Sequence, residues 1–298
     1  MADQAAPLKT YRGNCHCKAH VFEVRLPELK SLYSCNCSSC TKKGILWCYP
    51  EKQSDFTWIR GDEGSLADYA FGKKGMHYKF CPTCGVSLFC IGYFEPPQPG
   101  EEKNPAFALN ARTFQDLDIW SLETKLMDGA SYGAPFKPAK YAGHPPQAAP
   151  ENASTYHGSC HCGAVRVAMN SSPLGETHDG RVVECDCSIC GRYGAIWAYP
   201  REEYVAFEGE ENLSYYKMGN GLFNKGFCRV CGVPVENKAV SMSEEQKAAL
   251  SEVHRSWHDR GHVYRGLNSR VLNDVDLGKL KKERVYGWKG IPPQYENP

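Results

Sequence analysis

The sequence predicts two tandem copies of one small, mostly β domain, with few and short helices. Three observations support this prediction. Similar segments recur in the same order 145 to 158 residues apart, the apolar segments are short and end at turn residues, and 14 of the 16 cysteines fall into two matching sets. A chain of 298 residues has room for two domains of ordinary size, each with its own core.

The internal repeat covers most of the chain. YRGNCHC at Tyr11 returns as YHGSCHC at Tyr156, and three later pairs keep the same order: SCNCSSCTKKGILWCYP with ECDCSICGRYGAIWAYP, FCPTCGVSLF with FCRVCGVPVE, and ALNARTFQDLD with GLNSRVLNDVD. The spacing between the pairs drifts, so we expect shared strands and different loops. The repeat therefore predicts two copies of one domain.

A proline-rich segment separates the copies. Five prolines lie between Pro135 and Pro150, with little apolar periodicity around them. Proline lacks a backbone donor and favours extended conformers, so residues 137–154 are predicted to form a semi-rigid linker.

Within each copy the secondary structure is predicted to be short strands. HVFEVRL, VRVAM, ILWCYP and AIWAYP alternate or run apolar and are bounded by Gly, Pro or Asp. The clearest helix is an insertion in copy two, residues 241–261, with Ser243 as its N-cap. His254 and His258 lie four residues apart on it, with His262 beyond. We interpret them as a solvated helix face rather than a metal site.

Charge and hydropathy exclude several classes of protein. The chain has 35 Lys+Arg against 34 Asp+Glu, a formal charge of +1, which gives no overall attraction to nucleic acid or to anionic membranes. It has no apolar run long enough to span a bilayer, and its first residues lack the pattern of a secretory signal. We therefore expect a cytoplasmic protein with neither nucleic acid nor membrane as partner. Clustered thiols in that compartment more often bind metal than form disulfides.

Each copy carries seven cysteines in three groups: Cys15, Cys17, Cys35, Cys37, Cys40, Cys81 and Cys84 in copy one, and Cys160, Cys162, Cys185, Cys187, Cys190, Cys228 and Cys231 in copy two. Seven is odd, so disulfides alone do not account for the set. Zinc prefers four ligands, and CxC with CxxC supplies a closed four-cysteine site of the structural kind. CxCxxC then leaves three ligands and an open position, the pattern of a catalytic zinc. The chain would hold up to four zinc ions.

An alternative reading makes all seven cysteines structural ligands or redox thiols. Cys48 and Cys90 lie outside the repeat and are interpreted as small buried apolar residues.

Three thiolates leave a zinc centre with a formal charge of −1, which favours a thiol as fourth partner over water. Nearby cations would offset that charge, and three follow the triplets: Lys42, Lys43 and Arg192. Solvated surface charges are an equally good interpretation of these three.

The motifs GxCHCGxVxF, CxCSxCxxxG, FCxxCGVxxF and a later NxR resemble the glutathione-dependent formaldehyde-activating enzyme family, which also includes the centromere-protein-V domains. The resemblance spans Thr10 to Phe136 and Thr155 to Pro292 and appears twice, which departs from the single-domain pattern. It implies two tandem zinc-binding domains of the β-tent type. It also implies that each CxC and CxxC quartet holds a structural zinc, and that each CxCxxC triplet holds a catalytic zinc that meets a glutathione-linked substrate.

Other polar residues have two interpretations each. Arg112 and Arg270, in NAR and NSR, clamp a substrate carboxylate or pair with a nearby Asp. His16 and His161, inside CHC, act as bases or, preferably, bond the backbone of their turn. His77, where copy two has Asn224, moves protons or, preferably, lies at the surface.

The family resemblance implies a carbon–sulfur lyase, with zinc holding the sulfur of a glutathione or other thiol adduct. Glutathione would then be a co-substrate. The two copies would make a single chain resemble a dimer, so we expect the protein to be a monomer. The alternative is a non-enzymatic zinc module for protein or cytoskeletal partners, and a weaker one is a thiol redox role. The chain has no long basic or low-complexity tail, which favours the enzyme. The cations and the histidine of copy one favour that copy as the active one.

Overall fold

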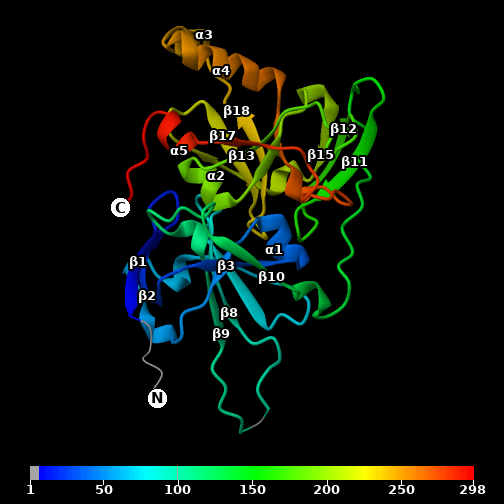
Figure 1. Cartoon of the computed structure of the whole chain (residues 1–298). Coiled ribbons are helices and arrows are strands. Elements are labelled where there is room, and N and C mark those ends of the chain that lie inside the picture. The colour runs from blue at the N-terminus through cyan, green and yellow to red at the C-terminus, as the bar shows by residue number, and fades with distance from the viewer. Residues whose placement is uncertain (1–6, 99) are drawn as a thin grey trace. The chain divides into compact units, whose positions relative to one another are not determined.

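The computed structural model describes residues 7–98 and 100–298 and divides the chain into two compact units (Figure 1). Unit 1 comprises the chain up to Phe136 together with Glu296–Pro298, and unit 2 comprises Lys137–Tyr295. Both units are built mainly from strands, and the predicted fold class of two similar, tandem, mostly β domains is confirmed. Within the described ranges, no helix combines the length and apolar character needed to cross a membrane.

Unit 1 contains two sheets. The smaller is antiparallel and has the order β1 (Leu8–Asn14), β2 (Val21–Pro27), β5 (Phe56–Arg60). The larger has seven strands in the order β10 (Glu123–Met127), β3 (Ser31–Cys35), β4 (Trp47–Cys48), β9 (Ala106–Asn110), β8 (Ser87–Gly92), β7 (Met76–Phe80), β6 (Ala67–Ala70). Only β10 and β3 pair in parallel among these described strands. Helix α1 (Ser38–Lys43) follows β3, and single 3-10 turns occur at Gln53–Asp55, Glu63–Ser65, Ala111–Thr113 and Gly129–Ser131.

Unit 2 repeats this arrangement strand for strand. Its smaller sheet has the order β11 (Ser154–Ser159), β12 (Arg166–Ser171), β15 (Val205–Glu208). Its larger sheet, taken from the matching end, has the order β20 (Glu283–Val285), β13 (Val182–Cys185), β14 (Ile196–Ala198), β19 (Gly266–Asn268), β18 (Pro234–Ala239), β17 (Phe223–Cys228), β16 (Leu213–Lys217). Its helices are α2 (Ser188–Tyr193), α3 (Glu244–Ala248), α4 (Glu252–Val263) and α5 (Gly287–Gly290), and its 3-10 turns are Glu202–Tyr204, Glu210–Asn212 and Ser269–Val271.

The core of unit 1 includes aromatic rings contributed by both of its sheets. Phe22 and Phe56 come from the smaller sheet, and Phe89 and Phe107 come from the larger one. The Phe56 and Phe107 ring centroids are 5.4 Å apart, and so are those of Phe89 and Phe107. Such edge-on aromatic pairs add attraction beyond the area they bury, so this cluster holds the two sheets together.

Unit 2 replaces two of these rings with an ion pair. The repeat matches Phe89 with Glu236 and Phe107 with Arg265. Arg265 Nε lies 2.5 Å from Glu236 Oε2, and the guanidinium lies 4.1 Å from the centroid of the Phe207 ring. Both charged side chains are buried. Burial opposes the charge of Arg265, but the attraction of Glu236, together with that of Glu202 and Glu210, outweighs it and raises the pKa of the guanidinium.

The predicted helical insertion is present but is divided into two helices, α3 and α4. Ser243 is the N-cap of α3, as predicted, and forms a capping box with Gln246. A second cap at Ser251 accepts a hydrogen bond from the His254 backbone and starts α4, which explains the interruption. The prediction of a solvated face is wrong for His258, because α4 packs against β18 and the side chain is fully buried. Its Nε2 lies 2.8 Å from the Val240 carbonyl. Its Nε2 also lies 3.1 Å from that of His262.

The described residues 137–153 form neither helix nor strand. Hydrogen bonds attach this segment to unit 2. The Ala142 backbone N–H donates to Glu208, and the Asn170 amide donates to the Ala148 carbonyl. This proline-rich segment therefore lies along the domain that follows it.

The buried ion pair of unit 2 gives a test of the fold. We expect Arg265→Met to destabilise unit 2 by about 3–5 kcal/mol, because Glu236 would remain as an uncompensated buried charge. Urea unfolding followed by circular dichroism measures the loss. The matched control is the double variant Glu236→Phe with Arg265→Phe, which copies unit 1 and should stay within about 2 kcal/mol of the parent. A single variant as stable as the parent would contradict this account.

Candidate metal centres

In unit 1, the four-cysteine cluster joins two turns that lie far apart in the sequence. Cys15 and Cys17 lie in the turn between β1 and β2 of the smaller sheet, and Cys81 and Cys84 lie in the turn between β7 and β8 of the larger one. Cys17 Sγ lies 3.5 Å from both Cys15 Sγ and Cys81 Sγ. Gly85 closes the second turn at a φ of 70°, which favours glycine, and its N–H donates to the Cys81 carbonyl.

Unit 2 has the same cluster in the corresponding turns. Cys162 Sγ lies 3.5 Å from Cys160 Sγ and 3.6 Å from Cys228 Sγ, and Cys231 completes the group. In each unit the four sulfur atoms all lie within 4.8 Å of one another. The Val165 backbone N–H donates to Cys160 Sγ at 3.3 Å and helps to orient it.

These quartets fit zinc. A tetrahedron with Zn–S bonds of about 2.3 Å has sulfur atoms about 3.8 Å apart, close to the observed separations. A disulfide needs about 2.05 Å, and all 16 cysteines are free. Four thiols from two separate turns match the donor set of structural zinc sites. The clusters can therefore hold zinc.

The three-cysteine cluster of unit 1 forms where β3 ends and α1 begins. Cys35 is the last residue of β3, Cys37 is the N-cap of α1, and Cys40 lies on that helix. The Cys40 backbone N–H donates to Cys37 Sγ, and the Cys37 N–H donates to Cys35 Sγ, both at 3.5 Å. Hydrogen bonds from Cys37 and Cys40 lower the pKa of Cys35 to about 3. The site therefore favours a thiolate at this position.

Unit 2 builds the same cluster from β13 and α2. Cys185, Cys187 and Cys190 lie within 4.8 Å of one another, and the Cys187 N–H donates to Cys185 Sγ at 3.3 Å. Hydrogen bonds from Cys185 and Cys187 hold the pKa of Cys190 well below its usual range, and the charge of Lys225 acts in the same direction. Among the described residues, no His, Asp, Glu or further Cys joins either triplet as a fourth member.

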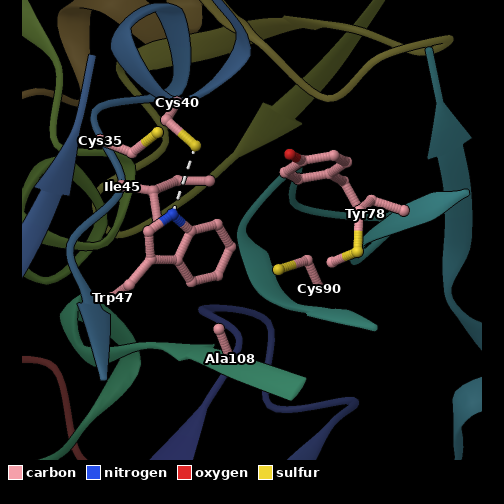
Figure 2. Packing of buried hydrophobic residues seen from close by; sticks show 8 residues of the cluster. Cys35, Cys40, Ile45, Trp47, Tyr78, Cys90 and Ala108 are labelled. Carbon is pink, nitrogen blue, oxygen red and sulfur yellow. Dashed lines mark hydrogen bonds between the residues drawn. The ribbon is translucent and has the colours of Figure 1, made fainter. Parts of the chain in front are cut away.

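A tryptophan donates to each triplet, and neither was predicted from the sequence. Trp47 Nε1 lies 3.2 Å from Cys40 Sγ (Figure 2), and Trp197 Nε1 lies 3.2 Å from Cys190 Sγ. Each stands seven residues after the last triplet cysteine, in ILWCYP and AIWAYP, and this shared position was the available signal.

Two glycines beside the triplets were also not predicted. β10 pairs in parallel with β3, and the chain then passes Cys35 at Gly129. A Cβ on Gly129 would overlap Cys35 Sγ, and one on Gly287 would come within 2.8 Å of Cys185 Sγ. Each triplet is therefore flanked by backbone where any larger residue would crowd the sulfur. The alignment of MDG with VYG in the repeat was the signal.

The interpretation of the three cations after the triplets as solvated surface charges is wrong, because Lys42, Lys43 and Arg192 are all buried. Lys43 Nζ lies 5.4–5.7 Å from the centroids of three aromatic rings of unit 1. Lys42 Nζ lies 6.0 Å from the Phe136 ring. Arg192 donates to the Ser188 carbonyl and lies 5.0 Å from the Tyr295 ring. Aromatic faces attract these charges and cover their apolar stems.

Lys225 is a further cation, and the sequence did not single it out. Its Nζ lies 3.7 Å from Cys190 Sγ and 4.9 Å from the centroid of the Trp197 ring. Nothing in FNKGFC distinguishes this lysine from a surface residue, and only the strand register aims it at the triplet.

The two NxR arginines hold the ends of the triplet helices. Arg112 Nε donates to the Gly44 carbonyl and Arg270 Nε to the Gly194 carbonyl, each at 2.6 Å. These glycines are the left-handed C-caps of α1 and α2. This contact was not among the roles expected from the sequence, and the clamp on a substrate carboxylate stays a prediction. The contacts show arginines that position the helix bearing the third cysteine.

The other residues singled out near the cysteine motifs are buried, except for His77. His16 and His161 are buried in the CxC turns. His77 lies at the surface, as preferred, with its Nδ1 2.7 Å from Asp68 Oδ2. Cys48 and Cys90 are buried, as predicted, and burial raises the pKa of both thiols, that of Cys90 to about 12.

The first prediction from this geometry concerns metal content. Protein purified without chelator should contain up to four zinc ions per chain, one for each cluster. The quartet ions should resist chelators longest, because a closed site offers no free position for a competing ligand. Elemental analysis during a chelator time course measures both. Fewer than two ions per chain would contradict the quartet assignment.

The second prediction separates the two kinds of cluster. Cys15→Ser or Cys228→Ser should unfold or insolubilise its own unit, because a structural zinc supplies folding free energy directly. Cys37→Ser or Cys187→Ser should leave a folded chain that has lost about one zinc ion. Circular dichroism and zinc analysis distinguish these outcomes, and identical behaviour of all four variants would refute the division into quartet and triplet.

Comparisons with known proteins agree with this geometry. Residues 10–119 and 155–265 match the family model described as glutathione-dependent formaldehyde-activating enzyme. A crystal structure of a Rhodobacter sphaeroides protein is 27% identical over 43% of this chain and 98% of that chain, with a TM-score of 0.32, which is too low to support any conclusion. The family match covers well over half of the chain, and each matched segment contains all seven clustered cysteines of its unit. The chain therefore belongs to the glutathione-dependent formaldehyde-activating enzyme family.

Proposed function

We propose that the chain is a zinc-dependent enzyme of the carbon–sulfur lyase type that acts on an adduct of glutathione or another thiol. In such an adduct, the carbon bound to sulfur carries a hydroxyl group. Cleavage breaks the carbon–sulfur bond with its electron pair going to sulfur, while the hydroxyl loses its proton and becomes a carbonyl. The reverse reaction joins thiolate and aldehyde.

The observation that carries this proposal is the three-sulfur cluster that accompanies each four-sulfur cluster. The quartets already offer zinc its four ligands, whereas the triplets offer three from the described residues. Three protein ligands and an open position are typical of catalytic rather than structural zinc. Membership of a family named for its dependence on glutathione supports a thiol as the fourth partner.

The residues around each triplet suit this task. When bound there, zinc would act as a Lewis acid that holds the substrate sulfur and stabilises it as a leaving or attacking thiolate. Cys35, Cys37 and Cys40 would hold the ion in unit 1, and Cys185, Cys187 and Cys190 in unit 2. The tryptophan N–H groups reduce the negative charge on Cys40 and Cys190. The glycine at the neighbouring position keeps a side chain from crowding the first sulfur of each triplet.

Exchange between free and adduct-bound formaldehyde tests the proposal. With glutathione and formaldehyde present, we expect the zinc-loaded chain to accelerate this exchange in NMR measurements. Cys37→Ser with Cys187→Ser should abolish the acceleration, because no complete triplet would remain. Cys48→Ala is the matched control and should keep full activity, since copy two has Ala198 at that position.

Two outcomes would overturn the proposal. One is a zinc-loaded chain that accelerates no thiol–aldehyde exchange at all. The other is a double variant that stays folded and remains as active as the parent.

A further inference from the structure

The repeat exchanges a lysine and a tyrosine between the two units. Unit 1 has Lys43 on α1 and Tyr78 on β7, and the matching positions of unit 2 are Tyr193 on α2 and Lys225 on β17. Both lysines are buried. Each unit therefore places one lysine and one tyrosine on the elements around its triplet. The lysine lies on the helix in unit 1 and on the strand in unit 2.

In unit 2 the lysine reaches the sulfur. Lys225 Nζ lies 3.7 Å from Cys190 Sγ and above the Trp197 ring, whose N–H donates to the same sulfur. Two donors from different strands therefore meet at the third sulfur of this triplet, and one of them belongs to a side chain that carries a positive charge.

In unit 1 a phenol takes the place of this lysine, and the lysine of that unit contacts aromatic rings. Tyr78 and Cys90 belong to one buried cluster with Cys40 and Trp47 (Figure 2). The charge of Lys43 faces aromatic rings, with its Nζ 5.7 Å from the centroid of Tyr78 and 5.4 Å from that of Phe80. The phenol ring of Tyr78 thus occupies, on β7, the position that Lys225 occupies on β17 of unit 2.

A second polar group accompanies Lys225. The register of β17 and β18 pairs Lys225 with Asn237, where unit 1 pairs Tyr78 with Cys90. Asn237 is buried, and its Oδ1 has no hydrogen-bond partner among the residues that the structure describes. A buried polar atom without a partner costs free energy. As an acceptor, this oxygen suits an N–H or O–H group of a ligand and not the thiolate itself, for which Lys225 is the matching group.

Charge determines what such a ligand gains. Three thiolates on a zinc ion carry a formal charge of −1, and a fourth thiolate makes the centre −2. Burying a further negative charge is unfavourable unless a cation offsets it. Lys225 supplies one positive charge within contact distance of the cluster.

We propose that the unit 2 triplet is the preferred thiolate-binding site of the chain, and that Lys225 is the residue that makes it so. The inference rests on the proposed function and names the unit and the residue that bind the thiol. It reverses the preference for copy one that the sequence alone favoured. Lys225 acts on the charge of the bound thiolate, and the cysteines remain the metal ligands.

Cadmium NMR tests the proposal without measuring activity. Cadmium replaces zinc in thiolate sites and reports on each cluster separately. Cys37→Ser and Cys187→Ser each remove one triplet signal and so assign the signals to units. Glutathione titrated into the cadmium-loaded chain should shift the unit 2 triplet signal at a lower concentration than the unit 1 triplet signal, and should leave both quartet signals in place.

Variants at Lys225 then test the residue. Lys225→Met should weaken glutathione binding at unit 2 by about tenfold or more, the size expected for the loss of one close charge in a buried site. Lys225→Arg should retain most of the binding. Lys43→Met is the matched control and should leave the unit 2 titration unchanged. An unchanged quartet signal from the unit that carries the substitution shows that each variant is folded.

The outcomes are distinguishable. Binding that is equal at the two triplets, or stronger at unit 1, overturns the proposal even if no Lys225 variant folds. Unit 2 binding that Lys225→Met leaves unchanged also overturns it, while the proposed function stands. If glutathione shifts neither triplet signal, the proposal and the proposed function both fail.

Discussion

The crowding of cysteine sulfurs is the constraint on which the rest of each unit depends. Four sulfurs from two turns lie within 4.8 Å of one another, and thiolates at that distance repel unless a cation neutralises them. The two turns belong to different sheets, so an ion bound by the four sulfurs would also join those sheets. In unit 1 aromatic rings pack between the same sheets. In unit 2 a buried arginine–glutamate pair takes the place of two of those rings. The four-cysteine cluster is therefore the contact between the two sheets that both units share.

The contrast between closed and open clusters arises from local chain geometry. A quartet forms because two turns meet, each bringing two cysteines. A triplet forms within one strand-to-helix connection, and the neighbour that approaches its first sulfur is a glycine backbone rather than another side chain. Gly129 and Gly287 therefore matter to the triplets as well, since a larger residue there would crowd the sulfur. On the proposed function, one fold would supply a saturated site for stability and an unsaturated site for chemistry.

Features encoded by local spacing were predictable from the sequence. The repeat, the mostly β fold, the Ser243 cap and the grouping of the sulfurs all follow from short motifs. Features that depend on strand register were not predictable. Lys225 contacts a sulfur because its strand, β17, directs the side chain towards the triplet. A lysine on the opposite face of a strand would be solvated. Lys43 and Arg192 look like surface charges in sequence, but aromatic rings distant along the chain cover their stems. His258 is buried because the face of α4 that carries it packs near Val240, whose carbonyl lies within hydrogen-bond distance of the His258 ring.

Anomalous diffraction at the zinc absorption edge, from crystals grown with glutathione, tests the central claim most directly. The account predicts two zinc peaks in each unit. One should be bonded to four cysteine sulfurs, and the other to three cysteine sulfurs and one ligand from outside the protein. Disulfides within the clusters, or a triplet zinc whose fourth ligand is another side chain of this protein, would contradict it.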